Sequence, residues 1–141
     1  MDWVASAREL AALIADITQV APREQWLTDR LLEFKFEPSD PAAATIELVA
    51  SSHDAIFSAG RATRFELDGP KAAQEKVAAL SRAVAAGRLV ETIRRHRVRY
   101  RIDLGDGSKM SGSSSLSVDR REEKPGTYRY VPYPEVGDTD G

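Results

Sequence analysis

Two stretches of this chain repeat apolar residues at steps of three and four positions, which is the spacing of an amphipathic helix. The first stretch covers residues 2–19, and Pro22 follows shortly after its end. The second covers residues 70–86; Pro70 suits a first helical turn, and Gly87 suits the position after a helix end. We predict a helix over each stretch, and we expect both helices to pack on the protein's own sheet rather than on a partner.

Other stretches alternate apolar and polar residues, which is the pattern of a strand with one buried and one solvated face. Gly60 is predicted to mark a bulge or bend, and residues 105–107 a hairpin turn. The serines of residues 108–118 bring little apolar surface, which favours an edge strand or a mobile flap there. The predicted strands cover residues 32–36, 46–50, 56–68, 89–104 and 108–118.

The order of these elements predicts an α+β fold, in which an antiparallel sheet carries two helices on one face in the order α-β-β-β-α-β-β. The large apolar residues of the helices and strands should form its core. The predicted core residues are Trp3, Leu10, Ile14, Phe34, Phe36, Phe65, Leu67, Val77, Leu80 and Ile102.

A chain of 141 residues corresponds to one domain of ordinary size. We place that single α+β domain in residues 1–118. In residues 119–141 charges, prolines and glycines replace periodicity, which predicts an irregular C-terminal arm with a disordered end. The segment from Tyr128 to Tyr133 could dock on the domain as an extended arm, and the sequence leaves this open.

Composition and charge exclude several function classes. A formal net charge of −2 argues against general affinity for nucleic acid, so any anion binding is expected at a local patch. Cysteine is absent, which excludes disulfides, thiolate nucleophiles and zinc sites with sulfur ligands. No stretch approaches about 18 apolar residues, and the first residues lack the pattern of a secretion signal. We expect a cytoplasmic protein without membrane contact; its alanine, arginine and aspartate bias suggests a GC-rich bacterial or phage genome.

Residues suited to catalysis are few. Only His53 and His96 could act as imidazole bases, and neither lies in a recognised motif. Residues 105–109 lack the spacing of a nucleotide-binding loop, and no helix is predicted after them. We predict no cofactor and no metal site. One enzymatic alternative is a hydrolase that uses a serine of residues 108–117 with one of the two histidines as base.

Four arginines alternate along the strand that is predicted to end at Leu104. Because strand geometry projects alternate side chains from one face, these arginines should share a solvated face and the residues between them should face the core. The four arginines are Arg95, Arg97, Arg99 and Arg101, and the residues predicted to face the core are Val98, Tyr100, Ile102 and Leu104.

Three explanations of the four arginines compete. They could form cross-strand ion pairs, they could bind an acidic protein surface, or they could bind nucleic acid. The third is the weakest, because base stacking needs aromatic side chains and Tyr100 should point the other way. The carboxylates proposed for the ion pairs are Glu33, Glu37, Glu47, Glu66 and Asp68.

Together these patterns predict a non-enzymatic protein-binding module, such as an adaptor, a small inhibitor or an immunity-type protein. Its binding residues are predicted to be Arg95, Arg97, Arg99 and Arg101, and its partner an acidic protein surface. Nucleic-acid binding through the same face is the alternative, and the serine hydrolase is a weaker one.

Overall fold

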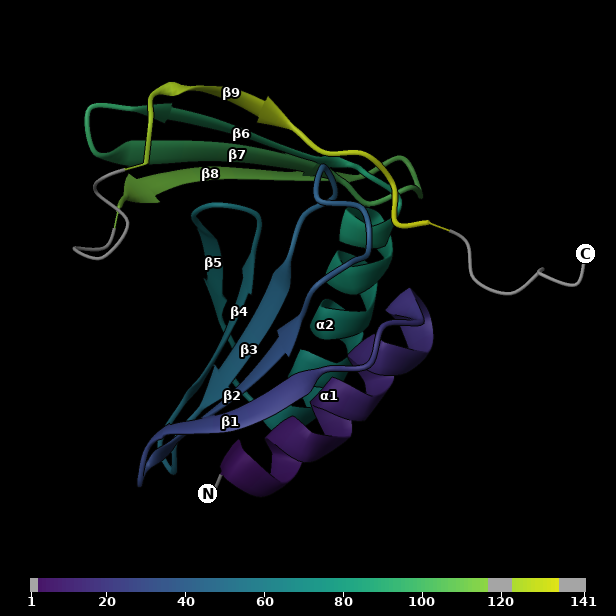
Figure 1. Ribbon diagram of the computed structural model, residues 1–141, viewed down its shortest axis with the longest axis vertical. Coiled ribbons are helices and arrows are strands. Elements are labelled where there is room, and N and C mark those ends of the chain that lie inside the picture. Colours follow the sequence, from purple (N-terminus) through teal and green to yellow (C-terminus); the bar gives the residue numbers. More distant parts are fainter. Residues whose placement is uncertain (1–2, 117–122, 135–141) are drawn as a thin grey trace, which may run out of the picture.

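The computed structural model describes residues 3–116 and 123–134, which form two helices and two antiparallel sheets (Figure 1). The α+β class is therefore confirmed, and the order of elements agrees broadly with the prediction. In chain order the elements are α1 (Trp3–Thr18), β1 (Arg23–Thr28), β2 (Leu31–Phe36), β3 (Ile46–Ala50), β4 (Ala55–Ala59), β5 (Thr63–Glu66), α2 (Pro70–Ala85), β6 (Leu89–Arg94), β7 (Arg97–Asp103), β8 (Lys109–Ser115) and β9 (Gly126–Arg129).

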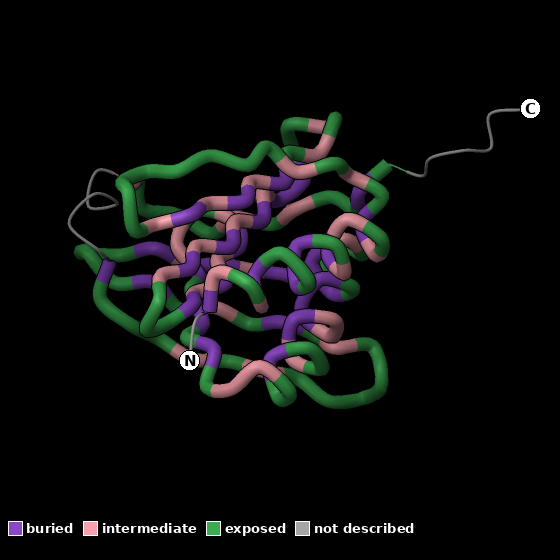
Figure 2. The backbone as a smooth tube through the Cα atoms, turned by 90° about the horizontal axis from the view of Figure 1, so that it is seen from below, coloured by how far each residue is buried: buried purple, intermediate pink, exposed green. Residues whose placement is uncertain are grey.

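The first sheet is a five-stranded meander in the order β1-β2-β3-β4-β5. Helices α1 and α2 lie side by side on one of its faces (Figure 1). Alternation places Leu32, Phe34 and Phe36 of β2 under the helices, while the residues between them face outward and are half-buried. The predicted one-sided burial is thus confirmed. All ten predicted core residues are buried, and Figure 2 shows how buried positions recur along the strands and helices.

The second sheet has four strands in the order β8-β7-β6-β9 and lies across the end of the first sheet, above the β4–β5 turn and the end of α2 (Figure 1). The single sheet expected from the sequence is therefore divided into two. Helix α2 carries the chain back from the end of β5 to the level of the β4–β5 turn (Figure 1), so β6 begins beyond the first sheet and pairs with β7 and β9 instead of β5.

Two strands were not predicted. Every residue of β1 is exposed, so its sequence has no one-sided alternation. Strand β9 lies in the segment that was predicted as an irregular arm, and it pairs with β6. Beyond it Tyr133 is buried, and its hydroxyl donates a hydrogen bond to the Ala44 carbonyl (2.5 Å), so this part of the arm docks on the domain. The predicted domain boundary at residue 118 and the disordered chain end lie outside the described residues.

A buried carboxylate joins the two sheets. Glu91 of β6 is fully buried, and it accepts hydrogen bonds from the backbone amides of Arg61 and Ala62 (both 2.8 Å) in the β4–β5 turn. It also accepts from the hydroxyl of Thr63 (2.7 Å) and from the hydroxyl of Tyr130. Four donors thus surround one carboxylate and fix the position of the second sheet.

A bulge or bend at Gly60 inside one strand over residues 56–68 was predicted, but Gly60 lies in a hairpin turn that divides this stretch into the paired strands β4 and β5. Its φ of +69° lies in the left-handed region, and a Cβ on it would lie 2.4 Å from the Glu91 carboxylate. Glycine is therefore required here both by the backbone and by the approach of Glu91. In the described part of the chain no helix is both long and apolar enough to cross a membrane.

Candidate anion-binding face

Strands β6 and β7 form a hairpin whose two-residue turn is Arg95-His96. Both turn residues have positive φ, 49° and 66°, as a type I′ turn requires. Arg95 is therefore not on the strand, and the prediction that it shares a strand face with three other arginines is wrong. Arg95 lies in the turn, yet its spacing of two residues from Arg97 is the same as the spacing along the strand. Because Arg-His is also not a recognised turn sequence, the sequence pattern did not indicate the turn.

The other three predicted arginines, Arg97, Arg99 and Arg101, do project from one exposed face of β7. The residues between them point inward as predicted: Val98 and Ile102 are buried, and Tyr100 packs against the core. Leu104, just after β7, packs against the same core. The strand therefore separates a cationic outer face from an apolar inner face.

Strand pairing extends this cationic face over the whole second sheet, because directly opposed residues project from the same face. Arg97 lies opposite Arg94 of β6, and Arg101 lies opposite Val90, which in turn is opposite Arg129 of β9. We call the resulting surface the arginine face. Its residues are Val90, Thr92, Arg94, Arg97, Arg99, Arg101, Asp103, Lys109, Ser111, Ser113, Ser115, Thr127 and Arg129.

The arginine face carries six cationic side chains and the single carboxylate of Asp103 among its described residues. Asp103 accepts a hydrogen bond from the Gly105 amide (2.9 Å) and lies opposite Lys109. The remaining polar positions are hydroxyl groups of serines and threonines. Such a surface offers many donors and few acceptors, and it therefore suits an anionic ligand.

The ion pairs proposed from the sequence do not form. Glu33, Glu37, Glu47 and Glu66 belong to the first sheet or its edge, and strand β7 is flanked by β6 and β8 in the second. Glu37 pairs instead with Arg23 (3.0 Å), and Glu47 lies 3.9 Å from Lys35. Asp68 follows β5 in the loop before α2, also outside the second sheet. Within residues 3–116 and 123–134, no ion pair includes a cation of the arginine face.

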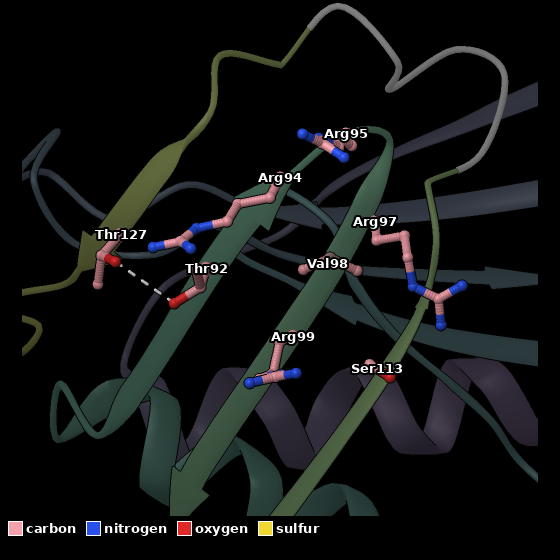
Figure 3. A pocket seen from close by; sticks show the side chains of 8 residues that line it. All are labelled: Thr92, Arg94, Arg95, Arg97, Val98, Arg99, Ser113 and Thr127. Atoms are coloured by element: carbon pink, nitrogen blue, oxygen red, sulfur yellow. Dashed lines mark hydrogen bonds between the residues drawn. The ribbon is translucent and has the colours of Figure 1, made fainter.

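A groove of about 590 Å³ opens at the hairpin end of the arginine face (Figure 3). Arg94 extends from β6 toward β9, Arg97 extends from β7 toward β8, and Arg95 lies at the turn. Thr92 and Thr127 are joined across the groove by a long hydrogen bond of 3.4 Å. The lining residues are Thr92, Arg94, Arg95, Arg97, Val98, Arg99, Ser113 and Thr127.

The tyrosines of the second sheet face away from the arginine face. The ring of Tyr100 meets Phe65 edge to face at 5.1 Å, and burial raises the pKa of its hydroxyl. Tyr128 lies opposite Glu91 on the inner side, with the Arg61 guanidinium 4.1 Å from its ring centroid. The described residues of the arginine face therefore include no aromatic ring on which a base could stack.

Known proteins offer no guide to this surface. The chain matches no family model, no curated protein and no solved structure. The chemistry of the arginine face is therefore argued from its own residues.

The enzymatic alternative requires a histidine in hydrogen-bond contact with a serine of β8. His53 lies in the β3–β4 turn of the first sheet, exposed and away from the serines of β8. His96 is exposed at the β6–β7 turn, and in the described chain neither imidazole is hydrogen-bonded to a serine of residues 108–116. The described residues also include no group of three or more potential metal ligands.

Two further turns hold polar residues of the candidate chemistry, and the one at residues 105–107 was predicted. Ser51 accepts hydrogen bonds from the amides of His53 (3.0 Å) and Asp54 (3.2 Å), so His53 is held in a solvated turn. Asp106 accepts from the amide and hydroxyl of Ser108 (2.9 and 2.5 Å) in the β7–β8 turn. The hydroxyl hydrogen bond, and then the amide, lowers the pKa of the Asp106 carboxyl. This carboxylate makes the turn unsuited to phosphate.

Four residues that matter to the site were missed: Glu91 and three cations of the arginine face, Arg94, Lys109 and Arg129. Glu91 alternates with Leu89 and Ile93 at the buried positions of β6. A carboxylate at such a position needs buried hydrogen-bond donors, and the sequence could have indicated them. Arg94 could have been found only by placing the turn at residues 95 and 96, which makes it the partner of Arg97. Arg129 gave no signal, because its strand pairs with β6 across a long sequence separation.

Proposed function

We propose that this protein is a binding module that holds an acidic surface of a partner protein on its arginine face. The observation that carries this proposal is the concentration of six cations and five hydroxyl groups on one exposed sheet face, where the described residues supply a single carboxylate. Arginine favours such a role because its planar fork binds carboxylates through two hydrogen bonds. An adaptor, a small inhibitor or an immunity-type protein would each be compatible with this proposal.

The spacing of the arginines suits an extended acidic segment. Alternate residues of a strand are about 6.6 Å apart, so Arg97, Arg99 and Arg101 match carboxylates on alternate residues of a partner strand. Arg94 and Arg129 add cations on neighbouring strands, so that the partner can be wider than one strand. Exposed ion pairs are each weak, about 0.2–1 kcal/mol, but several formed together give useful affinity.

Nucleic acid is the second candidate ligand for the cations of the arginine face. It fits the serine and threonine hydroxyls, which commonly contact phosphate. Against it stand the missing aromatic platform and the acidic net charge of the chain, −2. Acidic protein is therefore the preferred partner class, and nucleic acid is a defined outcome of the test.

The test compares a peptide with glutamate at every second position with single-stranded RNA and DNA of similar length, by fluorescence anisotropy at several salt concentrations. Arg97→Gln with Arg99→Gln should weaken peptide binding by about tenfold and leave folding within about 1 kcal/mol of the parent. Arg64→Gln with Arg82→Gln is the matched control, because it removes the same charge from exposed positions of β5 and α2. Its peptide binding should equal that of the parent.

Two results would overturn the proposal. One is equal loss of binding in both double variants, since that would mean net charge alone is responsible. The other is preferential binding of RNA or DNA, with a log affinity that falls linearly with log salt and a slope that shrinks in the Arg97 and Arg99 variant.

A further inference from the structure

We infer that the groove at the hairpin end of the arginine face receives a phosphate monoester, carried by a phosphorylated side chain of the acidic partner. The partner class rests on the proposed function, whereas the phosphate chemistry rests on the groove itself. The groove is distinct from the rest of the face in its charge density, its hydroxyl groups and its backbone.

The arginines of the groove carry more positive charge than one carboxylate can neutralise. Four of the eight lining residues are arginines, and they come from β6, the turn and β7. A carboxylate has one negative charge and two oxygens, which one or two guanidinium forks satisfy. A phosphate monoester carries about −1.5 to −2 charges near neutral pH and has three strong acceptor oxygens, so it can use more than one fork. In Figure 3 the side chains of Arg94 and Arg97 extend to opposite sides of the groove, and binding of one phosphate would turn them inward.

Hydroxyl groups complete the donor set of the groove. Thr92, Thr127 and Ser113 line it together with the arginines. The hydrogen bond between the two threonines is long, 3.4 Å, so both hydroxyls can turn to a better acceptor. Ser113 lies directly opposite Arg99 on β8 and makes no side-chain hydrogen bond within the described chain. Arginines with neutral hydroxyls form a typical set of phosphate contacts.

The backbone holds these groups together against unfavourable local energies. Arg94 and Arg97 are directly paired in the hairpin, and their like-charged side chains extend away from each other, toward β9 and toward β8 (Figure 3). The backbones of Arg95 and His96 are both in the left-handed conformation, which residues other than glycine rarely adopt. A multivalent anion relieves the repulsion, and the turn keeps Arg95 at the groove. The volume of about 590 Å³ leaves room for the residues beside a phosphorylated side chain.

The test uses three versions of one acidic peptide, with serine, glutamate or phosphoserine at the central position. The parent protein should bind the phosphoserine peptide about tenfold more tightly than the glutamate peptide. Arg94→Gln should remove this preference. Arg101→Gln is the matched control, because Arg101 lies on the same face but outside the groove; it should weaken all three peptides and keep the preference. Arg99→Gln serves as second groove variant if Arg94→Gln does not fold.

Each outcome separates the two proposals. If the peptides bind but glutamate equals phosphoserine, the groove inference is wrong and the proposed function stands. If free phosphoserine and the phosphopeptide bind, while the serine and glutamate peptides do not, the groove inference stands and the acidic-surface function is wrong. Binding of RNA or DNA without binding of the phosphopeptide would overturn both.

Discussion

At the scale of single residues, Glu91 has the clearest structural role in the described chain. Four donors converge on its carboxylate, and the residue is fully buried. Two of the partners are backbone amides, Arg61 on one carboxylate oxygen and Ala62 on the other, and because an amide N–H can only donate, both oxygens must accept. A buried hydrogen-bond network of this kind is costly to leave incomplete, because each unpaired donor has lost its contact with water.

Glu91→Gln should lower the free energy of unfolding by about 2–4 kcal/mol although the side chains have the same shape, because the amide group places a donor against donors. The measurement is urea unfolding followed by circular dichroism. Glu66→Gln, at an exposed position of β5, is the control and should change stability by less than about 0.5 kcal/mol. Equal small effects in the two variants would show that the network contributes little.

Tyr130 and Tyr133 should make the protein less stable in alkali. Burial raises the pKa of both hydroxyls, and for Tyr130 the nearby Glu91 charge raises it further. Above about pH 10 tyrosines of the unfolded chain lose their protons while these two keep theirs, so each should lower stability by about 1.4 kcal/mol per pH unit. Below that pH the contribution is constant. Tyr133→Phe should therefore reduce the fall in unfolding free energy between about pH 9 and about pH 11, and an unchanged fall would contradict this assignment.

At the scale of elements, the β6–β7 hairpin combines favourable strands with an unfavourable turn. A type I′ turn prefers Asn-Gly, and this chain has Arg95-His96. Each residue other than glycine in the left-handed region costs about 1–2 kcal/mol, with asparagine at the lower end. Natural sequences commonly keep such a cost at functional positions, which agrees with the groove assigned to this end of the sheet.

Arg95→Asn combined with His96→Gly should raise the free energy of unfolding by about 1–2 kcal/mol, because it supplies the preferred turn residues. Binding of the phosphoserine peptide should weaken at the same time, since Arg95 is lost from the groove. Arg95→Lys is the control: it keeps a charge and the strained backbone, so stability should not rise. A double variant of unchanged or lower stability would show that the turn is not strained.

The same elements show how far the sequence could predict this fold. Both helices and strands β2 and β3 bury one side, so period and burial agree and their positions were predicted within about two residues. Strand β1 is exposed throughout, and β9 is fixed by a distant partner, so neither leaves a local pattern. At the candidate site three arginines were placed correctly on the exposed strand face, whereas Arg95 was misplaced because the turn interrupts a spacing that looks continuous.

At the scale of the whole molecule, the two sheets share the main core, beside which Ile93, Val98 and Leu116 form a second, smaller cluster. Leu89 and Ile102 of the second sheet belong to the same buried cluster as the helices and the first sheet. The ring contact between Phe65 and Tyr100 joins β5 to β7. The hydrogen bond from the Tyr133 hydroxyl to the Ala44 carbonyl joins the C-terminal segment to the loop before β3. These contacts predict that the sheets unfold together, so that the arginine face remains a fixed platform for a partner.

Gly60→Ala tests this coupling at the point where the sheets meet. The new Cβ would lie 2.4 Å from the Glu91 carboxylate at a φ of +69°, so both backbone strain and displacement of Glu91 should follow. Gly107→Ala is the matched control, because its φ of +93° is also left-handed but no atom lies within 4 Å. The control should lose about 1–2 kcal/mol from strain alone, and Gly60→Ala should lose more.

Hydrogen exchange then distinguishes coupled from separate unfolding in the Gly60→Ala variant. If the sheets form one cooperative unit, the slowest amides of β3 and of β7 should lose protection by the same free energy. A loss confined to β6, β7 and β9 would mean that the second sheet opens separately from the first. The arginine face would then be a detachable element, and its affinity for a partner would include the cost of closing it.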